Sequence, residues 1–248
     1  MKKIPDGYQN EFLFVLAFNN KKVKELNPLL RQVIDESFYD ISDEAIIKSW
    51  RNHNSYEKAD ILIKIDDYVR SISIKKGSRN SVHAESIESF KEFLRELEVK
   101  EKIIYYYELF HYGVSFRNFN KILSSKEYVK KNKRKIKKVN EALKKVDIDK
   151  VIDRFILLGN NSKYRVAGII DGTPDDFVWI TREDIVTSIK NNINRESSSV
   201  HMGPLFIQPM NRCINENKKY LWCRDIVQIK WYSLYDDIII NMNNKVNR

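Results

Sequence analysis

The chain has 248 residues, of which 42% are hydrophobic and 31% charged, so it can bury a sizeable core and is neither disordered nor fibrous. Its formal charge of +10 favours a polyanionic partner, nucleic acid before an anionic membrane surface. No apolar run approaches the ~20 residues that span a bilayer, and the N-terminus lacks the apolar stretch of a signal peptide. We therefore expect a cytoplasmic protein without a membrane partner.

Cys213 and Cys223 lack the neighbours of a metal-binding pattern, which favours free thiols.

The N-terminal third changes its hydrophobic period once. Apolar residues between Phe12 and Ile34 recur at helical spacing, with a break at Pro28. Residues 43–50 are expected to form a short amphipathic turn or helix. Residues 59–66 and 68–76 then alternate between apolar and polar positions around a short acidic turn, which predicts a β-hairpin.

The middle of the chain is predicted to return to helical structure and then to the sheet. Residues 83–98 have helical spacing, and the apolar and aromatic run at 102–110 is typical of a buried strand, as in a parallel sheet. The predicted order is helix, strand, strand, helix, strand. Residues 126–145 hold ten Lys or Arg against two Glu along a narrow apolar stripe, which indicates a basic surface helix.

The rest of the chain is predicted to contain two pairs of strands with one helix between them. The expected strands cover 163–171, 177–182, 205–208 and 226–231, and the helix lies near 182–191. We divide the chain into a core at 1–124 and a C-terminal part at 125–248, packed together as one globular unit.

The predicted hairpin carries the most informative chemistry. Ser73 and Lys75 point to the same face of one strand because side chains alternate with a period of two. Asp60 opens the facing strand, where its carboxylate can lie beside them. A carboxylate with an adjacent cation suits metal-assisted cleavage of a phosphodiester. Alternatively, Asp60 and Lys75 are structural, since both residue types solvate well at strand ends.

These residues resemble the motif of the PD-(D/E)xK nuclease superfamily, above all type II restriction endonucleases. In that superfamily a proline-aspartate pair begins one strand and Glu-x-Lys ends the next, on a helix-strand-strand-strand-helix-strand core. Here Ala59-Asp60 and Ser73-Ile74-Lys75 stand at those positions, so the proline and the strand carboxylate are absent. The similarity covers roughly the first half of the chain. It implies an α/β fold with a restriction-endonuclease-like core, a mixed central sheet flanked by helices, and a C-terminal α+β extension.

A Ser-x-Lys variant of the family takes the missing carboxylate from the following helix. Glu85 and Glu88 are the candidates here; they are three residues apart and are expected on one helix face. The stretch Lys-Lys-Gly-Ser-Arg-Asn-Ser-Val-His-Ala-Glu at 75–85 also looks like a motif of restriction-enzyme-like proteins.

The resemblance implies catalysis with Mg²⁺. Asp60 and Glu85, or Glu88 in its place, would hold the ion together with the backbone carbonyl of Ile74. Lys75 would orient the attacking water or stabilise charge on the phosphate. Glu11, on the first helix, could reach the site through water.

Nucleic-acid contacts are expected beside the site and in the C-terminal part. His83 and the Arg79-Asn80-Ser81 loop could meet phosphates, or form an ordinary capped turn. Amide, guanidinium and ammonium groups of the C-terminal part suit base edges, while Trp222 and Trp231 are predicted to be packing residues. The expected DNA-binding residues are Lys76, Arg79, Asn80, Ser81, His83, Asn211, Arg212, Arg224, Gln228 and Lys230.

We therefore expect a magnesium-dependent, sequence-specific endonuclease acting on double-stranded DNA. A palindromic site would imply a homodimer, and a companion DNA methyltransferase is possible. The alternatives are a less specific repair or mobile-element nuclease on the same core, and a non-catalytic nucleic-acid-binding protein.

Overall fold

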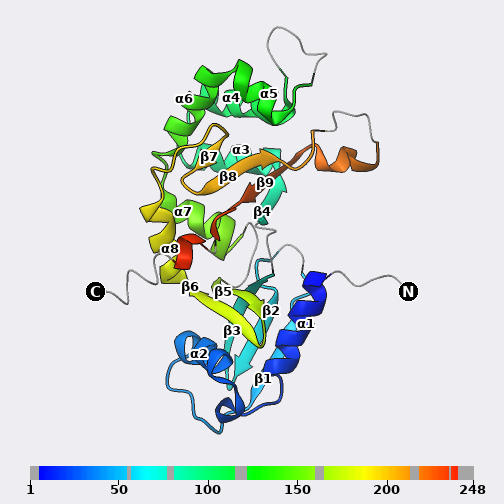
Figure 1. Ribbon diagram of the computed structural model, residues 1–248, viewed down its shortest axis with the longest axis vertical. Coiled ribbons are helices and arrows are strands. Elements are labelled where there is room, and N and C mark those ends of the chain that lie inside the picture. The colour runs from blue at the N-terminus through cyan, green and yellow to red at the C-terminus, as the bar shows by residue number, and fades with distance from the viewer. Residues whose placement is uncertain are drawn as a thin grey trace. The chain divides into compact units, whose positions relative to one another are not determined.

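The computed structural model describes residues 6–54, 57–76, 81–114, 122–159, 165–212, 218–234 and 236–239. The fold is α/β, and the chain divides into two compact units (Figure 1). Unit 1 comprises residues 1–80, 152–188 and 235–248, and unit 2 comprises residues 81–151 and 189–234. This division differs from the one predicted at residue 124, because the chain leaves unit 1 and returns to it further along the sequence.

Unit 1 is built on a mixed five-stranded sheet with the order β1-β2-β3-β5-β6. Its strands are β1 (Ile47–Arg51), β2 (Ile61–Ile65), β3 (Tyr68–Lys75), β5 (Val166–Thr173) and β6 (Asp176–Thr181). Neighbouring strands run antiparallel except β3 and β5, which are parallel. The β2–β3 hairpin and the β5–β6 pair confirm the strands predicted in these regions.

Helices α1 (Asp6–Phe18) and α2 (Pro28–Ser37) pack against this sheet, and Figure 1 shows α1 running alongside β1. Phe14 and Phe18 of α1 belong to the same buried cluster as Ile72 and Ile74 of β3. Pro28 begins α2, where a proline costs no hydrogen bond. A short 3₁₀ turn, η1 (Val23–Glu25), connects the two helices.

The helix that precedes the parallel strand comes much later in the chain than predicted. After β3 the chain forms unit 2, and it returns through α7 (Ile148–Ile152) and the π-helical turn η2 (Asp153–Leu157) to β5. Unit 1 with this lead-in therefore has the order two helices, three antiparallel strands, a helical segment, the parallel strand β5 and the antiparallel strand β6. Residues 83–98 and 102–110, which were expected to complete this order, belong to unit 2 instead.

Unit 2 contains a four-stranded antiparallel sheet with the order β4-β9-β8-β7. The strands are β4 (Ser81–Ser86), β7 (His201–Met202), β8 (Leu205–Pro209) and β9 (Ile226–Lys230). Helices α3 (Ile87–Glu96) and α4 (Glu101–Tyr112) pack on it, and α5 (Ser125–Lys131) and α6 (Lys133–Leu143) pack on α4. The chain also forms α8 (Arg182–Asn191), as predicted, and a 3₁₀ segment η3 (Lys218–Cys223).

Four predicted elements were wrong in type or extent. Residues 102–110 lie in helix α4, because the run buries Ile104, Tyr107 and Phe110 at helical spacing and Gly113 caps it at a φ of 69°. Residues 47–51 form strand β1, in which buried and exposed side chains alternate. Residues 81–86 form β4, and α3 begins after Ser86, whose hydroxyl accepts a hydrogen bond from the Ser89 amide. The basic stretch forms two helices that meet at Asn132.

Within the described part of the chain, none of the helices has the length and apolar character needed to cross a membrane. Cys223 is buried, whereas Cys213 lies outside the described residues.

Candidate active site

The hairpin of unit 1 places Asp60, Ser73 and Lys75 together, as its sequence predicts. Asp60 immediately precedes β2, where its amide donates to the Ile72 carbonyl of β3 at 2.9 Å. Its Oδ2 accepts hydrogen bonds from the Ser73 hydroxyl at 2.9 Å and from the Ile74 amide at 2.6 Å. The Lys75 ammonium lies 3.6 Å from the same oxygen. Two hydrogen bonds and one ion pair from three successive residues of β3 thus hold the carboxylate in one orientation.

The pleat of β3 separates this polar cluster from the core. Ile72 and Ile74 belong to the apolar cluster that includes Phe14 and Phe18, whereas Ser73 and Lys75 alternate with them. Ser73 is buried, while the side chains of Lys75 and Asp60 are 26% and 27% exposed. The cluster therefore remains accessible to a ligand at the end of the hairpin.

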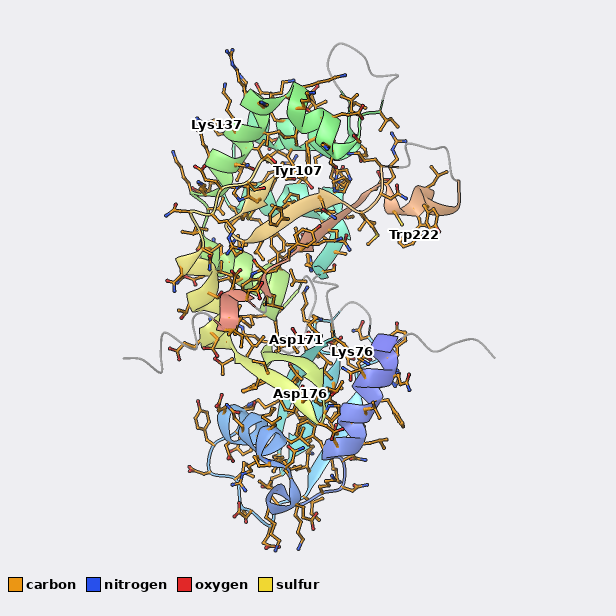
Figure 2. All side chains as sticks on the ribbon, in the orientation of Figure 1. Lys76, Tyr107, Lys137, Asp171, Asp176 and Trp222 are labelled. Carbon is orange, nitrogen blue, oxygen red and sulfur yellow. The ribbon has the colours of Figure 1, made fainter. Side chains whose placement is uncertain are left out.

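The structure adds a carboxylate that the sequence reasoning missed. Asp171 of β5 is the register partner of Lys75 in the parallel β3–β5 pair. Burial raises the pKa of Asp171, and the positive charge of Lys75 opposes this rise. Figure 2 labels Asp171 at the same end of the unit 1 sheet as Lys76, which follows β3 directly. No local pattern could identify Asp171, because its position depends on strand pairing between distant segments.

Glu11 of helix α1 is a further carboxylate close to Asp60. Its Oε2 accepts a hydrogen bond from Nε of Arg51 at 3.0 Å. Burial and the negative charge of Asp60 raise the pKa of Glu11, while the hydrogen bond and charge of Arg51 and the charge of Lys75 lower it. The side chain of Asn10 fixes this end of α1 by donating to the Gly172 carbonyl, next to Asp171. The expectation that Glu11 lies near the hairpin site is therefore consistent with the electrostatics.

The carboxylate oxygens of this cluster are the type of ligand that suits a hard cation held by few protein groups. Among the described residues, no group of three or more His, Cys, Asp or Glu side chains is close enough to hold a metal ion. Magnesium usually keeps several waters and takes only one or two carboxylates plus substrate phosphate oxygens. Asp60 Oδ1 takes no part in the hydrogen bonds to Ser73 and Ile74, and Glu11 and Asp171 are further carboxylates whose charges interact with this cluster.

Glu85 and Glu88 are not on one helix face, which corrects the prediction. Glu85 lies on β4 of unit 2, where it accepts from the Ser89 hydroxyl at 2.9 Å and lies 3.4 Å from His83 Nε2. Its side chain is 1% exposed. Glu88 is in the first turn of α3, 68% exposed, and pairs with Lys91. Since Asp60 belongs to unit 1 and both glutamates to unit 2, their sharing of one ion stays a prediction.

Arg212 is a structural residue, contrary to the expectation that it contacts DNA. It is 6% exposed, and its guanidinium donates to the carbonyls of His111, Leu123 and Phe110 around the C-terminus of α4. Burial lowers the pKa of Arg212 to about 10. All three hydrogen bonds satisfy helix-end or loop carbonyls, so the side chain is not directed at a ligand.

Six of the other predicted DNA contacts are not brought together by the structure. His83 is buried on a strand, so it cannot meet phosphate from a helix N-terminus as expected. Lys76 is exposed, Asn211 is half-buried, and Arg224 lies 5.6 Å over the Tyr112 ring. Arg79 and Asn80 lie outside the described residues.

Three predicted contacts do come together on one surface. Ser81, Gln228 and Lys230 lie on paired strands of the unit 2 sheet.

Of the two tryptophans predicted to pack, Trp231 is fully buried, whereas Trp222, labelled in Figure 2, is 68% exposed on η3.

In comparisons with known proteins, no protein-family model matches the chain and no curated sequence matches it.

Proposed function

We propose that the protein is a magnesium-dependent endonuclease that cleaves double-stranded DNA at specific sequences, as a type II restriction enzyme does. The observation that carries the proposal is the cluster of Asp60, Ser73 and Lys75, in which one carboxylate oxygen accepts two hydrogen bonds and pairs with the lysine at the open end of a hairpin. The cluster pairs a fixed carboxylate with a lysine, which is the chemistry that the sequence motif implies.

The order of elements supports the same proposal. Unit 1, with the helical segment α7–η2 that leads into β5, contains the helix-strand-strand-strand-helix-strand order of the superfamily, with α2 and β6 as additions. It has an antiparallel β1–β2–β3 meander and a β5 parallel to β3. The catalytic residues would lie where β2 begins and β3 ends. Residues 81–151, the first segment of unit 2, lie between β3 and the return of the chain to β5, so the sequence does not display this order continuously.

Each side chain has a distinct part in the proposed reaction. When bound, magnesium supplies positive charge that polarises the phosphate and acidifies water. Asp60 is oriented to bind the ion, and Asp171 or Glu11 supplies the second carboxylate within unit 1. Lys75 is placed to stabilise negative charge developing on the phosphate oxygens or to orient the attacking water. Ser73 fixes Asp60 through its hydroxyl, and so acts as a positioning residue.

Digestion of a long unmethylated phage DNA tests the proposal. The chain and its Asp60→Asn and Lys75→Ala variants are incubated with Mg²⁺ or with EDTA, and the products are separated on a gel. Asp67→Ala and Lys64→Ala are matched controls, because both residues lie on the same hairpin away from the cluster. We expect discrete fragments from the unaltered chain and both controls in Mg²⁺, and intact DNA from Asp60→Asn and Lys75→Ala.

Three outcomes would contradict the proposal in different ways. Fragments that persist in Asp60→Asn and Lys75→Ala would place the chemistry elsewhere. A continuous smear instead of discrete fragments would favour the less specific repair or mobile-element nuclease. Intact DNA under every condition, with unchanged DNA binding, would favour a non-catalytic nucleic-acid-binding protein.

The last alternative has its own support in unit 2. Helices α5 and α6 carry most of the basic stretch on exposed or half-exposed positions, and Ile136, Val139 and Leu143 turn inward. Lysines spaced along a surface helix neutralise phosphates without reading bases, and such binding weakens steeply with salt. Binding by this surface is compatible with either function.

A further inference from the structure

The sheet of unit 2 has one covered face and one open face. Helices α3 and α4 pack against the face that holds the buried residues Ile207, Val227 and Ile229. Alternation along β4, β8 and β9 sends a second set of side chains to the opposite face. We call this set, with the neighbouring Tyr232, the glutamine face: Ser81, Phe206, Gln208, Gln228, Lys230 and Tyr232, all partly or largely exposed.

A row of hydrogen bonds fixes the amides of the glutamine face. Gln208 and Gln228 are directly opposite each other on β8 and β9, and Gln208 Nε2 donates to Gln228 Oε1 at 3.4 Å. Gln228 Nε2 donates to the Ser81 hydroxyl at 3.1 Å, and the Tyr232 hydroxyl donates to Gln208 Oε1 at 3.2 Å. Each amide nitrogen has two N–H groups, and this row engages one of each. Both amides thus retain hydrogen-bonding capacity in a preset orientation.

The charge of the glutamine face favours a polyanion. Lys230 supplies a positive charge, and none of the outward-facing residues of the described strands β4, β8 and β9 is acidic. Glu85, the acidic residue of β4, is buried on the covered side. A surface of amides, a hydroxyl and a cation without carboxylates complements DNA, whose groove edges offer donors and acceptors between rows of phosphates.

The chemistry of the face fits a duplex better than a single strand. Proteins bind single strands mainly by stacking bases on aromatic rings. Here the Tyr232 ring packs edge-on with Phe206 at 5.2 Å between centroids, and the Lys230 ammonium lies 5.6 Å from its centre. The two rings therefore pack against each other and the lysine lies against one of them, while the glutamine amides face the solvent side of the sheet. Glutamine pairs with adenine through its N6 and N7 in the major groove, which β-sheet readers enter with their strands.

We propose that the glutamine face is the sequence-reading surface of the protein, with Gln208 and Gln228 contacting base edges in the major groove of duplex DNA. This inference rests on the proposed function for its substrate and adds to it the place where specificity is determined. Lys230 contacts the neighbouring phosphate and adds affinity without discrimination.

Binding selection tests this assignment separately from cleavage. The full chain carrying Lys75→Ala is used in Mg²⁺ to enrich sequences from a random duplex pool, and fluorescence anisotropy then measures Kd for the enriched duplex and a scrambled one. Gln208→Ala, Gln228→Ala and Lys230→Ala are added individually to this chain. Gln32→Ala is the matched control, because Gln32 is a surface glutamine on α2 of unit 1. Urea unfolding midpoints show that each variant is folded.

We expect each glutamine variant of the face to reduce the ratio of the two Kd values roughly ten- to one-hundred-fold, the range for losing one bidentate base contact. Lys230→Ala should weaken binding to both duplexes equally, and Gln32→Ala should change neither. The inference is overturned if no sequence is enriched, if both glutamine variants keep the full ratio, or if they lose affinity only for single strands. Loss of the fragment pattern in the digestion test, with the glutamine effect intact, would refute the nuclease and leave this surface as a DNA reader.

Discussion

Replacing Ser73 by alanine separates the orientation of Asp60 from the stability of the sheet. The Ser73 hydroxyl donates to Asp60 Oδ2 at 2.9 Å, and the serine is 4% exposed. A hydrogen bond to a charged group contributes about 1.5–3 kcal/mol. Because the Asp60 side chain is 27% exposed, water can replace part of the lost bond, and we expect Ser73→Ala to lower the free energy of unfolding by about 1–2 kcal/mol.

Ser71→Ala is the control, because Ser71 is a second buried serine on the same strand. Its hydroxyl donates to the Arg165 carbonyl at 2.9 Å, away from the carboxylate. This variant should lose about 1 kcal/mol, the ordinary value for a neutral hydrogen bond. The two variants therefore form a pair with similar stability and different effects on Asp60.

Urea unfolding and the rate of DNA cleavage are measured on both variants. We expect Ser73→Ala to cleave about tenfold more slowly than the unaltered chain, because only the Ile74 amide and Lys75 then hold Asp60. Ser71→Ala should cleave at the unaltered rate. Equal cleavage rates for the two variants would refute the role of Ser73 as the residue that positions Asp60.

Two further predictions concern a carboxylate and a buried histidine. Asp171→Asn should slow cleavage at least tenfold, while the free energy of unfolding stays the same or rises because the substitution removes a half-buried charge. Asp176→Asn is the control, because Asp176 is exposed at the start of β6. Equal cleavage rates for the two variants would exclude Asp171 from the site. His111 is fully buried with Nε2 2.9 Å from the Arg224 carbonyl, and burial lowers its pKa from 6.5 to about 4. On acidification the imidazole of His111 is therefore protonated in the unfolded chain at a higher pH than in the folded chain. The free energy of unfolding should keep its full value above pH 6.5 and fall by up to about 3 kcal/mol by pH 4. Urea unfolding at pH 7.5 and 4.5 measures the loss, and a His111→Gln variant with the same pH dependence would contradict this origin.

The hairpin could be predicted because the pattern that specifies it lies within a few consecutive residues of the sequence. Strands β2 and β3 alternate over a few residues on either side of a short turn, and that pattern fixes which side chains share a face with Lys75. Asp60 and Ser73 therefore appear together both in the sequence reasoning and in the structure. The same local logic identified β5, β6, β8 and β9.

The segment after the hairpin could not be predicted in the same way. An apolar run such as 102–110 suits a buried strand or a buried helix, and only its packing through Tyr107 and Phe110 decides for α4. The parallel pairing of Ser71 with Val166 joins segments separated by most of unit 2, and no periodicity records it. The position of Asp171 follows from that pairing, and the position of Glu85 follows from the equally long-range pairing of β4 with β9.

Residues 81–151 of unit 2 separate β3 from β5 in the sequence, and this has a consequence for the timing of activity during synthesis. Glu11, Asp60 and Lys75 emerge early from the ribosome, whereas Asp171 emerges only after all of residues 81–151 and the lead-in to β5 have been made. The β3–β5 pair is a non-local contact and forms late, because loop-closure entropy must be overcome first. A nascent or truncated chain would hold the hairpin without its neighbouring strand. A nuclease arranged in this way would stay inactive towards the DNA of its own cell until β5 has paired with β3.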